Sequence, residues 1–449
     1  MSDLSVIILA AGEGSRMKSA TPKPLHEVAG LSLLGHCYAA ADAAGAGARA
    51  VVVGAGGDQV AAAARALDER TRVFEQAERL GTAHAVLAAR EALERAAGDV
   101  VVLYGDTPFI RAETLAKMRA APADVVVLGF RAEAPGGYGR LVLDGARLTA
   151  IVEAADASDE ERAIDLCNSG VVMARGDALL SLLSEVKNDN AKGEYYLTDI
   201  VAIANARGLS CVMVECDEAE TLGVNSRADL AAAEAAFQTR AREAAMAGGA
   251  TLVSPETVWF SADTTLEADV IVEPNVVFGP GVAVASGARI RAFSHLENCR
   301  VGPNAIIGPY ARLRPGADIG EGARIGNFVE VKNAAFGTGA KANHLAYVGD
   351  AAVGARANIG AGVITCNYDG VNKHRTEIGE GAFVGTNSSL VAPVKIGDGA
   401  YVGSGSTITS DVESDALGLA RARQVVKPGF AVRLRKLLLA QKEKKSKGG

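Results

Sequence analysis

A six-residue spacing of aliphatic side chains constrains the fold of this chain more than any other feature. The spacing runs unbroken through two stretches, and a longer segment between Ile364 and Ile378 separates them. Its positions are Val301, Ile307, Leu313, Ile319, Ile325 and Val331, then Ile378, Val384, Leu390, Ile396, Val402 and Ile408. A period of six fits neither the 3.6-residue repeat of an α-helix nor the alternation of a single strand. It predicts a parallel β-helix, in which each hexad forms one flat side and one corner and the aliphatic side chains stack inward.

The first half of the chain alternates between strand-like and helix-like segments. Runs that predict strands occur at Val6–Leu9, Ala50–Val53, Arg72–Glu75, Val100–Tyr104, Asp124–Phe130, Leu166–Met173 and Ser210–Val214. Helical patterns lie between them, for example at Gly81–Ala96 and Tyr195–Ala206. This alternation predicts a Rossmann-like α/β domain with a mostly parallel sheet, helices on both faces and ligands at the carboxyl ends of the strands.

A glycine-rich loop follows the first predicted strand. It runs from Gly12 to Arg16, and Lys23 follows between two prolines. Backbone N–H groups in such a loop can surround phosphate oxygens, and Arg16 and Lys23 add positive charge. The spacing matches neither the P-loop nor the dinucleotide-binding pattern G-x-G-x-x-G. A tight strand-to-helix turn that binds nothing is the alternative.

Asp106 comes just after the most apolar predicted strand, Val100–Leu103. This placement puts a carboxylate at the ligand-binding edge of the sheet. Magnesium binds one or two protein oxygens together with phosphate oxygens and water, so Asp106 is a candidate ligand. The alternative is a cap or turn residue ahead of Pro108.

The interruption of the six-residue spacing predicts a loop that leaves one edge of the β-helix, where such folds carry function. Upstream, His344 stands two residues after Ala342, which takes an inward position, so His344 is expected to project outward. An imidazole, with an ordinary pKa of about 6.5, suits the removal of a proton from an amine. A surface histidine without a catalytic role is the alternative.

Two further segments connect or end the domains. Ser226 to Asp229 has the spacing of a capping box, and an alanine-rich helix is expected to follow as far as Ala247. That helix could be a rigid spacer or could pack on the first domain. The segment from Arg421 onward carries ten Lys and Arg against Glu443 alone. A solvated basic tail, helical from Phe430 to Gln441, is expected there.

Composition narrows the class of protein. The formal net charge is −7, and the chain before Arg421 is more acidic still, which argues against general nucleic-acid binding. The six cysteines show no C-x-x-C spacing, so free thiols in a reducing cytoplasm are expected. The chain shows neither a signal peptide nor an apolar segment long enough to span a membrane. A cytoplasmic location is therefore expected.

The motifs of the first half resemble those of sugar-nucleotide pyrophosphorylases, which join a sugar 1-phosphate to a nucleoside triphosphate and release pyrophosphate. The matching segments are Leu9 to Met17, Pro22-Lys23, Gln76, Gly81 to Ala85, Tyr104 to Asp106, Gly137 to Arg140, Glu153, Asn168 to Gly170 and Gly223 to Asn225. The resemblance implies that Gln76, Gly81 and Thr82 read a uracil base. It implies that Asp106 and Asn225 bind magnesium.

The same resemblance implies further contacts for this half. The implied substrate-binding residues are Leu9, Ala10, Ala11, Gly12, Lys23, Tyr104 and Gly105, with Gly139, Glu153 and Asn168 for the sugar. Because the sugar phosphate is already a nucleophile, no protein base is needed. Lys23 and Arg16 are expected to stabilise charge that develops on the transferred phosphate.

With its second half included, nearly the whole chain, to about Ala420, resembles the bifunctional N-acetylglucosamine-1-phosphate uridylyltransferase/glucosamine-1-phosphate N-acetyltransferase family. Its motifs here are Ala311 to Pro315, Asn327 to Lys332, Asn343 to Tyr347 and Thr365 to Arg375. The resemblance implies a left-handed β-helix and a homotrimer with acetyl-transfer sites between subunits. It also implies that His344 is the general base.

This second resemblance implies two sets of binding residues. Those for the sugar phosphate are Arg314, Lys332, Tyr347 and Asn358, and those for acetyl-CoA are Ala361, Asn367, Tyr368, Thr386, Ser404 and Arg421. Thr386, Ser404 and the segment 420–423 depart from the residues common in the family. The implied reactants are UTP, glucosamine 1-phosphate, N-acetylglucosamine 1-phosphate and acetyl-CoA, with Mg²⁺, and the product serves peptidoglycan and lipopolysaccharide synthesis.

The expected division of the chain is a pyrophosphorylase domain at 1–225, a linker helix at 226–248, a β-helix acetyltransferase domain at 249–427 and a basic tail at 428–449. Two other functions stay open from the sequence. The β-helix could be a purely structural module on an enzyme with nucleotidyl transfer alone, or the chain could be a nucleotide-sugar sensor without turnover.

Overall fold

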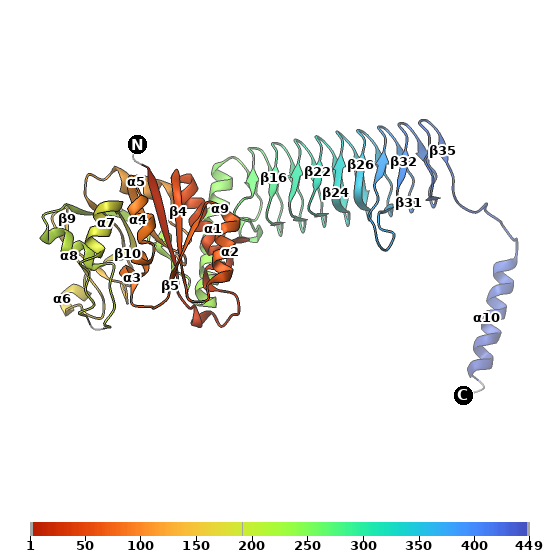
Figure 1. Cartoon of the computed structure of the whole chain (residues 1–449). Helices are drawn as coiled ribbons and strands as arrows, with labels where there is room; N and C mark the ends of the chain where they lie inside the picture. The colour runs from red at the N-terminus through yellow and green to blue at the C-terminus, as the bar shows by residue number, and fades with distance from the viewer. Residues whose placement is uncertain (1–2, 191, 447–449) are drawn as a thin grey trace. The chain divides into compact units, whose positions relative to one another are not determined.

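The computed structural model describes residues 3–190 and 192–446, so residues 447–449 of the expected basic tail lie outside the described part. The chain forms two compact units (Figure 1). The N-terminal unit comprises Met1–Ala244 with Phe260–Asp263, and the C-terminal unit comprises Ala245–Trp259 with Thr264–Gly449. In the described residues, no helix combines the length and apolar character needed to cross a membrane.

The N-terminal unit is built on a sheet whose main strand order is β11-β7-β10-β6-β1-β4-β5. These strands are β1 (Leu4–Ala10), β4 (Ala46–Gly54), β5 (Arg72–Gln76), β6 (Asp99–Tyr104), β7 (Val125–Arg131), β10 (Leu166–Arg175) and β11 (Cys211–Cys216). All seven expected strands are confirmed. Strand β10 runs antiparallel to both neighbours, and the other pairs along this path are parallel.

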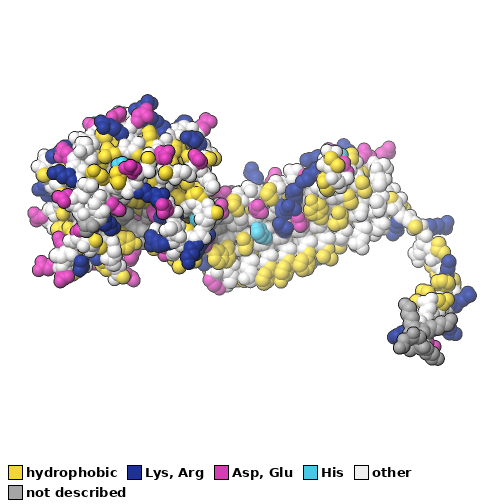
Figure 2. Space-filling model, turned by 60° about the horizontal axis from the view of Figure 1, so that its bottom comes forward, with side chains coloured by type: hydrophobic (Ala, Val, Ile, Leu, Met, Phe, Trp, Pro, Cys, Tyr) yellow, Lys and Arg dark blue, Asp and Glu magenta, His cyan; other side chains and the backbone are white. Residues whose placement is uncertain are grey.

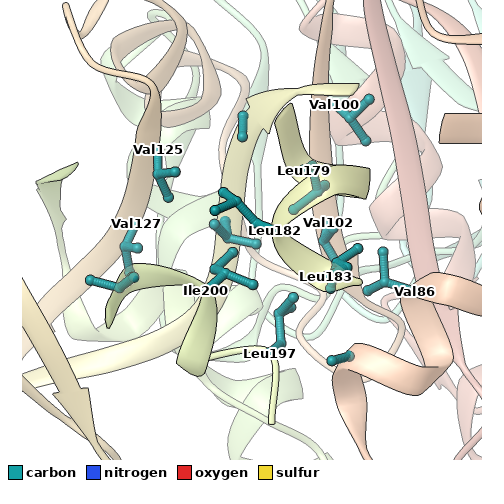
Figure 3. Close-up of a cluster of buried hydrophobic side chains, with 14 of the residues drawn as sticks. Val86, Val100, Val102, Val125, Val127, Leu179, Leu182, Leu183, Leu197 and Ile200 are labelled. Atoms are coloured by element: carbon teal, nitrogen blue, oxygen red, sulfur yellow. The ribbon is translucent and has the colours of Figure 1, made fainter. Parts of the chain in front are cut away.

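Helices cover both faces of this sheet, because its central strands are apolar on both sides. On one face, Ile7 and Val102 pack against α3 (Thr82–Ala88), α4 (Arg90–Arg95), α7 (Gly176–Leu183) and α8 (Asp199–Ala206), as Figure 3 shows around Leu179 and Ile200. On the other face, Val6 and Val101 pack against α1 (Leu33–Ala43), α2 (Asp58–Leu67) and α5 (Ala112–Ala120). The expected two-faced α/β domain is confirmed.

Smaller elements complete the unit. They are β2 (Glu27–Val28), β3 (Leu31–Ser32), α6 (Asp159–Arg162) and short 3-10 helices at Ser15–Met17, Lys23–Leu25 and Glu218–Thr221. A hairpin of β8 (Arg140–Asp144) and β9 (Arg147–Val152), which the sequence did not predict, pairs with β10.

Two expected helices differ from the structure. The segment 81–96 is not continuous, because Ala89 leaves helical geometry between α3 and α4. The second helix begins at Asp199 rather than at Tyr195. Tyr195 cannot join it, because its backbone N–H donates to Leu80 O at 2.7 Å and its carbonyl accepts from Ala83 N at 2.9 Å.

Helix α9 (Arg227–Ala247) ends where the sequence predicted. Its Ala233 is buried in a cluster with Met17, Leu33 and Phe109, so the helix packs on the N-terminal unit.

The C-terminal unit is a parallel β-helix made of two long sheets (Figure 1). The ten-stranded sheet comprises β12 (Thr251–Leu252), β14 (Ile271–Val272), β17 (Arg289–Ile290), β20 (Ile306–Ile307), β23 (Arg324–Asn327), β25 (Lys341–His344), β27 (Asn358–Ile359), β30 (Phe383–Val384), β33 (Tyr401–Val402) and β35 (Leu417–Gly418). The fourteen-stranded sheet comprises β13 (Thr265–Leu266), β15 (Val277–Phe278), β16 (Val282–Val284), β18 (His295–Leu296), β19 (Cys299–Val301), β21 (Arg312–Leu313), β22 (Ala317–Ile319), β24 (Glu330–Phe336), β26 (Tyr347–Val353), β28 (Ile364–Cys366), β29 (Thr376–Ile378), β31 (Ser389–Val391), β32 (Val394–Ile396) and β34 (Thr407–Ile408). All twelve aliphatic positions of the six-residue spacing are buried, as predicted.

The interruption of the spacing is a loop, as expected. The coil from Asn358 to its register partner Phe383 spans 25 residues, whereas the coil from Lys341 to Asn358 spans 17. The loop closes on itself through an antiparallel bridge between Tyr368 and Lys373. Beyond the β-helix, α10 (Phe430–Ser446) extends past the expected helical run, and its side chains are exposed as far as Glu443.

Candidate active sites

A cavity of about 260 Å³ lies at the carboxyl ends of β1 and β6. This is the edge where parallel α/β sheets bind ligands. The cavity is lined by Leu9, Ala10, Ala11, Gly12, Lys23, Pro24, Gln76, Arg79, Gly81, Thr82, Ala85, Tyr104, Gly105, Asp106 and Glu194. Eleven of these are residues that the sequence singled out, so the fold brings together most of the expected nucleotide-binding set.

The Lys23 ammonium forms hydrogen bonds to both expected metal ligands, Asp106 and Asn225. Its Nζ lies 2.5 Å from Asp106 Oδ2 and 3.1 Å from Asn225 Oδ1. The two oxygens therefore converge on one position that a cation already occupies, which fits a site for a divalent ion. In the described residues there is no group of three or more His, Cys, Asp or Glu arranged to hold a metal. A metal at Asp106 and Asn225 therefore needs phosphate or water oxygens to complete its coordination.

The start of α9 fixes Asn225. Asp229 Oδ2 accepts from the backbone N–H groups of Ser226 at 2.9 Å and Asn225 at 3.0 Å, and Asp229 N donates to Ser226 Oγ at 3.2 Å. This is the predicted capping box, which satisfies free N–H groups at the helix start. It holds the backbone of a candidate metal ligand in place.

Glycines let the backbone close around the cavity at two positions. Gly14 has φ +62°, and a Cβ there would lie 2.6 Å from Lys23 Cβ. Gly81 has φ +116°, and a Cβ there would lie 2.4 Å from the backbone oxygen of Tyr195. Residues with a side chain rarely adopt such φ values, so both positions need glycine.

Hydrogen bonds to backbone groups fix the side chains of Gln76 and Thr82. The buried Gln76 amide donates to Gly81 O at 3.1 Å, and Thr82 Oγ1 accepts from Leu197 N at 2.9 Å. Burial raises the pKa of Tyr104, and the negative charge of Asp106 raises it further. The phenol therefore stays neutral at physiological pH.

The three expected sugar-binding residues lie together next to this cavity. Asn168 N donates to Gly139 O at 2.8 Å, and a Cβ on Gly139 would lie 3.6 Å from Glu153 Oε1. Glu153 Oε1 also accepts from Thr198 Oγ1 at 3.2 Å. Tyr104 lines both the main cavity and a small cavity beside Asn168, which connects the two groups.

One expected catalytic residue lies apart, and other cavity residues were not predicted. Arg16 is exposed on the 3-10 helix Ser15–Met17, outside the residues that line the cavity. Arg79 and Glu194 line the cavity, and Arg79 forms an ion pair with Glu13. No local motif marks Arg79 or Glu194, because the fold brings them to the cavity from separate loops.

In the β-helix, four expected residues of the second site fall in one column. They are His344, Ala361, Thr386 and Ser404, and each stands two residues after the inward residue of a strand in the ten-stranded sheet. Asn327 takes the same position in β23. His344 is exposed, as expected from the inward position of Ala342. The general-base candidate and three expected acetyl-CoA contacts therefore line a single corner of the β-helix.

Asn327 is a partner of His344 that the sequence analysis did not assign. The two residues are register neighbours in β23 and β25, and Asn327 Oδ1 lies 2.7 Å from His344 Nδ1. A carbonyl oxygen only accepts, so Nδ1 carries the proton in this arrangement. The lone pair of Nε2 is then free to take a proton from a substrate.

A cluster of positive charge contains two expected phosphate ligands and one unexpected residue. Lys373, from the inserted loop, lies against Lys332, and this neighbouring ammonium lowers the pKa of Lys332. Arg314 contributes to the same effect and pairs with Glu330 at 2.7 Å. Figure 2 shows Lys and Arg side chains gathered on one face of the β-helix. Lys373 was missed because only the path of the loop brings it to Lys332.

The remaining expected residues are spread over several surfaces. Tyr347 begins β26 in the fourteen-stranded sheet, whereas Asn358 begins β27 in the ten-stranded sheet. In the inserted loop, the Asn367 side chain is buried and bonded to Asp350, while Tyr368 is exposed. Arg421 donates from Nη1 to Ser404 O at 3.0 Å.

Comparison with known proteins bears on both units. Residues 6–172 match the MobA-like NTP transferase domain, and residues 298–333 and 375–410 match bacterial transferase hexapeptide repeats. "Bifunctional protein GlmU" from Cereibacter sphaeroides is 59% identical over 99% of this chain and 98% of its own length. The chain belongs to the GlmU family.

Other GlmU proteins agree. The one from Azorhizobium caulinodans is 60% identical over 96% of this chain and 97% of its own length. The one from a Bradyrhizobium species is 57% identical over 97% of this chain and 98% of its own length. This GlmU-family chain is therefore a bifunctional transferase of UDP-N-acetylglucosamine synthesis, with uridylyltransferase and acetyltransferase activities that serve cell-wall synthesis. Its hexapeptide repeats form the left-handed β-helix that the family resemblance implied. The structural-module and sensor alternatives no longer hold.

Proposed function

We propose that uridylyl transfer takes place in the cavity at the ends of β1 and β6. The convergence of Lys23, Asp106 and Asn225 carries this proposal. UTP binds along the segment from Leu9 to Gly12, with its uracil against Gln76, Gly81 and Thr82. N-acetylglucosamine 1-phosphate binds beside it against Gly139, Glu153 and Asn168.

The reaction needs alignment and charge stabilisation rather than a base. A phosphate oxygen of the sugar substrate attacks the α-phosphorus of UTP, and the bond from that phosphorus to the pyrophosphate oxygen breaks. Asp106 and Asn225 would hold Mg²⁺, which would supply positive charge to the phosphates when bound. The Lys23 ammonium would stabilise the charge on the phosphate oxygens. Arg16 contributes charge from outside the cavity wall.

Magnesium removal tests this assignment on the intact chain. With excess chelator, we expect pyrophosphate release to stop, while thiol release from acetyl-CoA continues, because only uridylyl transfer uses the Asp106–Asn225 pair. Mg²⁺ added back should restore pyrophosphate release. Asn225→Ala should raise the Mg²⁺ concentration needed for half-maximal rate about tenfold, by the loss of one ligand. Pyrophosphate release that persists in chelator contradicts the proposal.

We propose that acetyl transfer takes place along the corner that carries His344. The amine of glucosamine 1-phosphate attacks the thioester carbonyl of acetyl-CoA, forming the C–N bond, and the C–S bond then breaks. His344 Nε2 takes the proton from the amine and returns one to the leaving sulfur. The sugar phosphate binds to Arg314, Lys332 and Lys373, where closely placed like charges favour a dianion. The coenzyme lies along the column from Ala361 to Ser404, near Arg421.

Asn327 is proposed to position the base. Asn327→Ala should lower kcat for acetyl transfer roughly tenfold, because the ring loses the acceptor that fixes its tautomer. Asn327→Asp should keep much of the rate but move the acidic limb of the pH–rate profile to higher pH, because a carboxylate stabilises the imidazolium. A profile of Asn327→Asp that is identical to that of the unmodified chain would show that the bond has no catalytic effect.

We further propose that the acetyl-transfer site is completed by other copies of the chain in a homotrimer. Asn358 lies in the ten-stranded sheet, whereas Lys332 and Tyr347 lie in the fourteen-stranded sheet and Arg314 directly follows its strand β21. In the proposed trimer, one substrate contacts these two groups from different chains. Near His344, an apolar ladder also stands open to solvent. It consists of Phe293, Tyr310, Phe328 and Leu345, which are 47–59% exposed.

The ladder has features of a contact surface. Its aromatic rings stack with centroids 4.9 and 5.2 Å apart. All four residues have φ between +52° and +60°, a conformation that costs of the order of 1 kcal/mol for a residue with a side chain. Exposed apolar patches of this kind mark protein–protein contacts.

Substitution of the ladder tests the trimer. We expect the unmodified chain to sediment at three times 46.0 kDa and the variant Tyr310→Ser/Phe328→Ser to sediment at 46.0 kDa. The variant should lose acetyl transfer and keep uridylyl transfer. Val253→Ser, an exposed apolar residue outside the ladder, is the matched control and should remain trimeric. A double variant of unchanged mass would show that the ladder is not the contact.

A further inference from the structure

A second cavity of the β-helix lies beside His344 and is assigned no ligand by the proposed function. Its volume is about 200 Å³, and it opens on the outer face of the ten-stranded sheet. The polar residues that line it are Arg291, Arg324, Asn327, Asn343 and His344. The rest of its wall comes from Ile306, Gly308, Pro309, Ile325 and Gly326. Arg314, Lys332 and Lys373 do not line it, so it is separate from the proposed sugar-phosphate cluster.

The cavity is positively charged and contains no acidic side chain. Among the described residues, neither the Arg291 nor the Arg324 guanidinium has an ion pair. The nearby Arg289 does have an ion pair, with Glu273 at 3.0 Å. Two unneutralised guanidinium groups at one cavity repel each other, and a bound anion removes that repulsion.

The hydrogen-bonding groups match a phosphate group. A guanidinium offers paired N–H donors that fit two oxygens of a phosphate. Asn327 uses Oδ1 for His344, which leaves its NH₂ group to donate. The side chain of Asn343 adds a further NH₂ group at the wall. The cavity is therefore lined by two arginines and two amide side chains that can donate hydrogen bonds, and its volume is larger than one phosphate ion needs.

We propose that this cavity is a binding site for a phosphate group, either inorganic phosphate or the phosphate of a small monoester, held by Arg291 and Arg324 next to His344. The inference does not depend on the catalytic role of His344, which serves only as a reporter. An anion in this cavity lies beside the imidazole and so changes its magnetic environment.

The test uses the full chain with ¹³C-labelled histidine in chloride buffer. The chain has 6 histidines, and His344→Gln identifies the resonance of His344. Inorganic phosphate is titrated first and glucosamine 1-phosphate is titrated separately, and the tighter probe identifies the source of the phosphate. We expect a saturable shift of the His344 resonance. In Arg291→Gln/Arg324→Gln the affinity should fall at least about tenfold, as loss of hydrogen bonds to charged groups implies.

Two matched variants make the result specific. Arg300→Gln removes an exposed arginine elsewhere on the β-helix and should leave the titration unchanged. Arg314→Gln/Lys332→Gln removes charge from the sugar-phosphate cluster and should retain the His344 shift with inorganic phosphate. The inference is overturned if neither probe moves the resonance, or if the Arg314/Lys332 variant loses the shift and the Arg291/Arg324 variant keeps it. Acetyl transfer, assayed in phosphate-free buffer, tests the proposed function separately.

Discussion

Asp106→Asn is expected to lower uridylyl transfer about a hundredfold or more while leaving acetyl transfer unchanged. The substitution keeps the shape of the side chain and removes its charge, so Lys23 loses its charged partner at 2.5 Å and the proposed magnesium site loses its only anionic protein ligand. Loss of one preorganised electrostatic contact in a reaction of this kind costs about 10²–10³ in rate. Pyrophosphate release from UTP and N-acetylglucosamine 1-phosphate measures the effect.

A matched control separates this effect from a general loss of charge. Asp144 is an exposed carboxylate at the end of β8, outside the cavity, so Asp144→Asn should retain full uridylyl transfer. Raised Mg²⁺ should recover little activity in Asp106→Asn. If Asp106→Asn retained more than about a tenth of the rate, the proposed metal position would be wrong.

His344→Ala is expected to lower acetyl transfer by about 10²–10⁴, the range for loss of a general base. Uridylyl transfer should not change, because His344 and Asp106 belong to different units of the chain. Thiol release from acetyl-CoA in the presence of glucosamine 1-phosphate measures the effect.

His295 offers a matched control for the base. It is another exposed histidine of the β-helix, at the start of β18, and it does not line the corner that carries His344. His295→Ala should therefore release thiol at the normal rate. If both histidine variants were equally impaired, a general effect on the β-helix would explain the loss and the assignment of His344 would fail.

The parts of the fold that could be predicted depend on short-range patterns. The six-residue spacing from Val301 to Ile408 repeats within each coil, so the inward positions could be read directly and all are buried. The same holds for the strands of the α/β sheet, whose apolar runs are continuous because both faces are covered. The capping box at Ser226 is also local, and its reciprocal bonds form as predicted.

The features that were missed depend on contacts between distant segments. The helix expected from Tyr195 begins at Asp199 because the backbone of Tyr195 bonds to Leu80 and Ala83, far away in sequence. The β8–β9 hairpin has short strands, and no local sequence pattern predicts that β8 pairs with β10.

The candidate sites show the same division. Lys23 and Asp106 were predicted because each stands in a motif, and the fold brings them together from segments 83 residues apart. Asn327 and Lys373 stand in motifs and Glu194 stands in none, but none of the three was given a role, because each reaches its site only through the path of a coil or loop. A role that depends on contact between distant segments is therefore harder to predict from the sequence than a role carried by a motif alone.

A mixing experiment tests whether two independent sites on this chain carry out consecutive reactions. Asp106→Asn and His344→Ala are each supplied with glucosamine 1-phosphate, acetyl-CoA, UTP and Mg²⁺, alone and together. We expect that neither variant alone forms UDP-N-acetylglucosamine at an appreciable rate and that the mixture does, because acetylated sugar released by Asp106→Asn is used by His344→Ala. If the mixture stays inactive while the unmodified chain turns over, or if either variant alone loses both activities, the claim of two independent sites is contradicted.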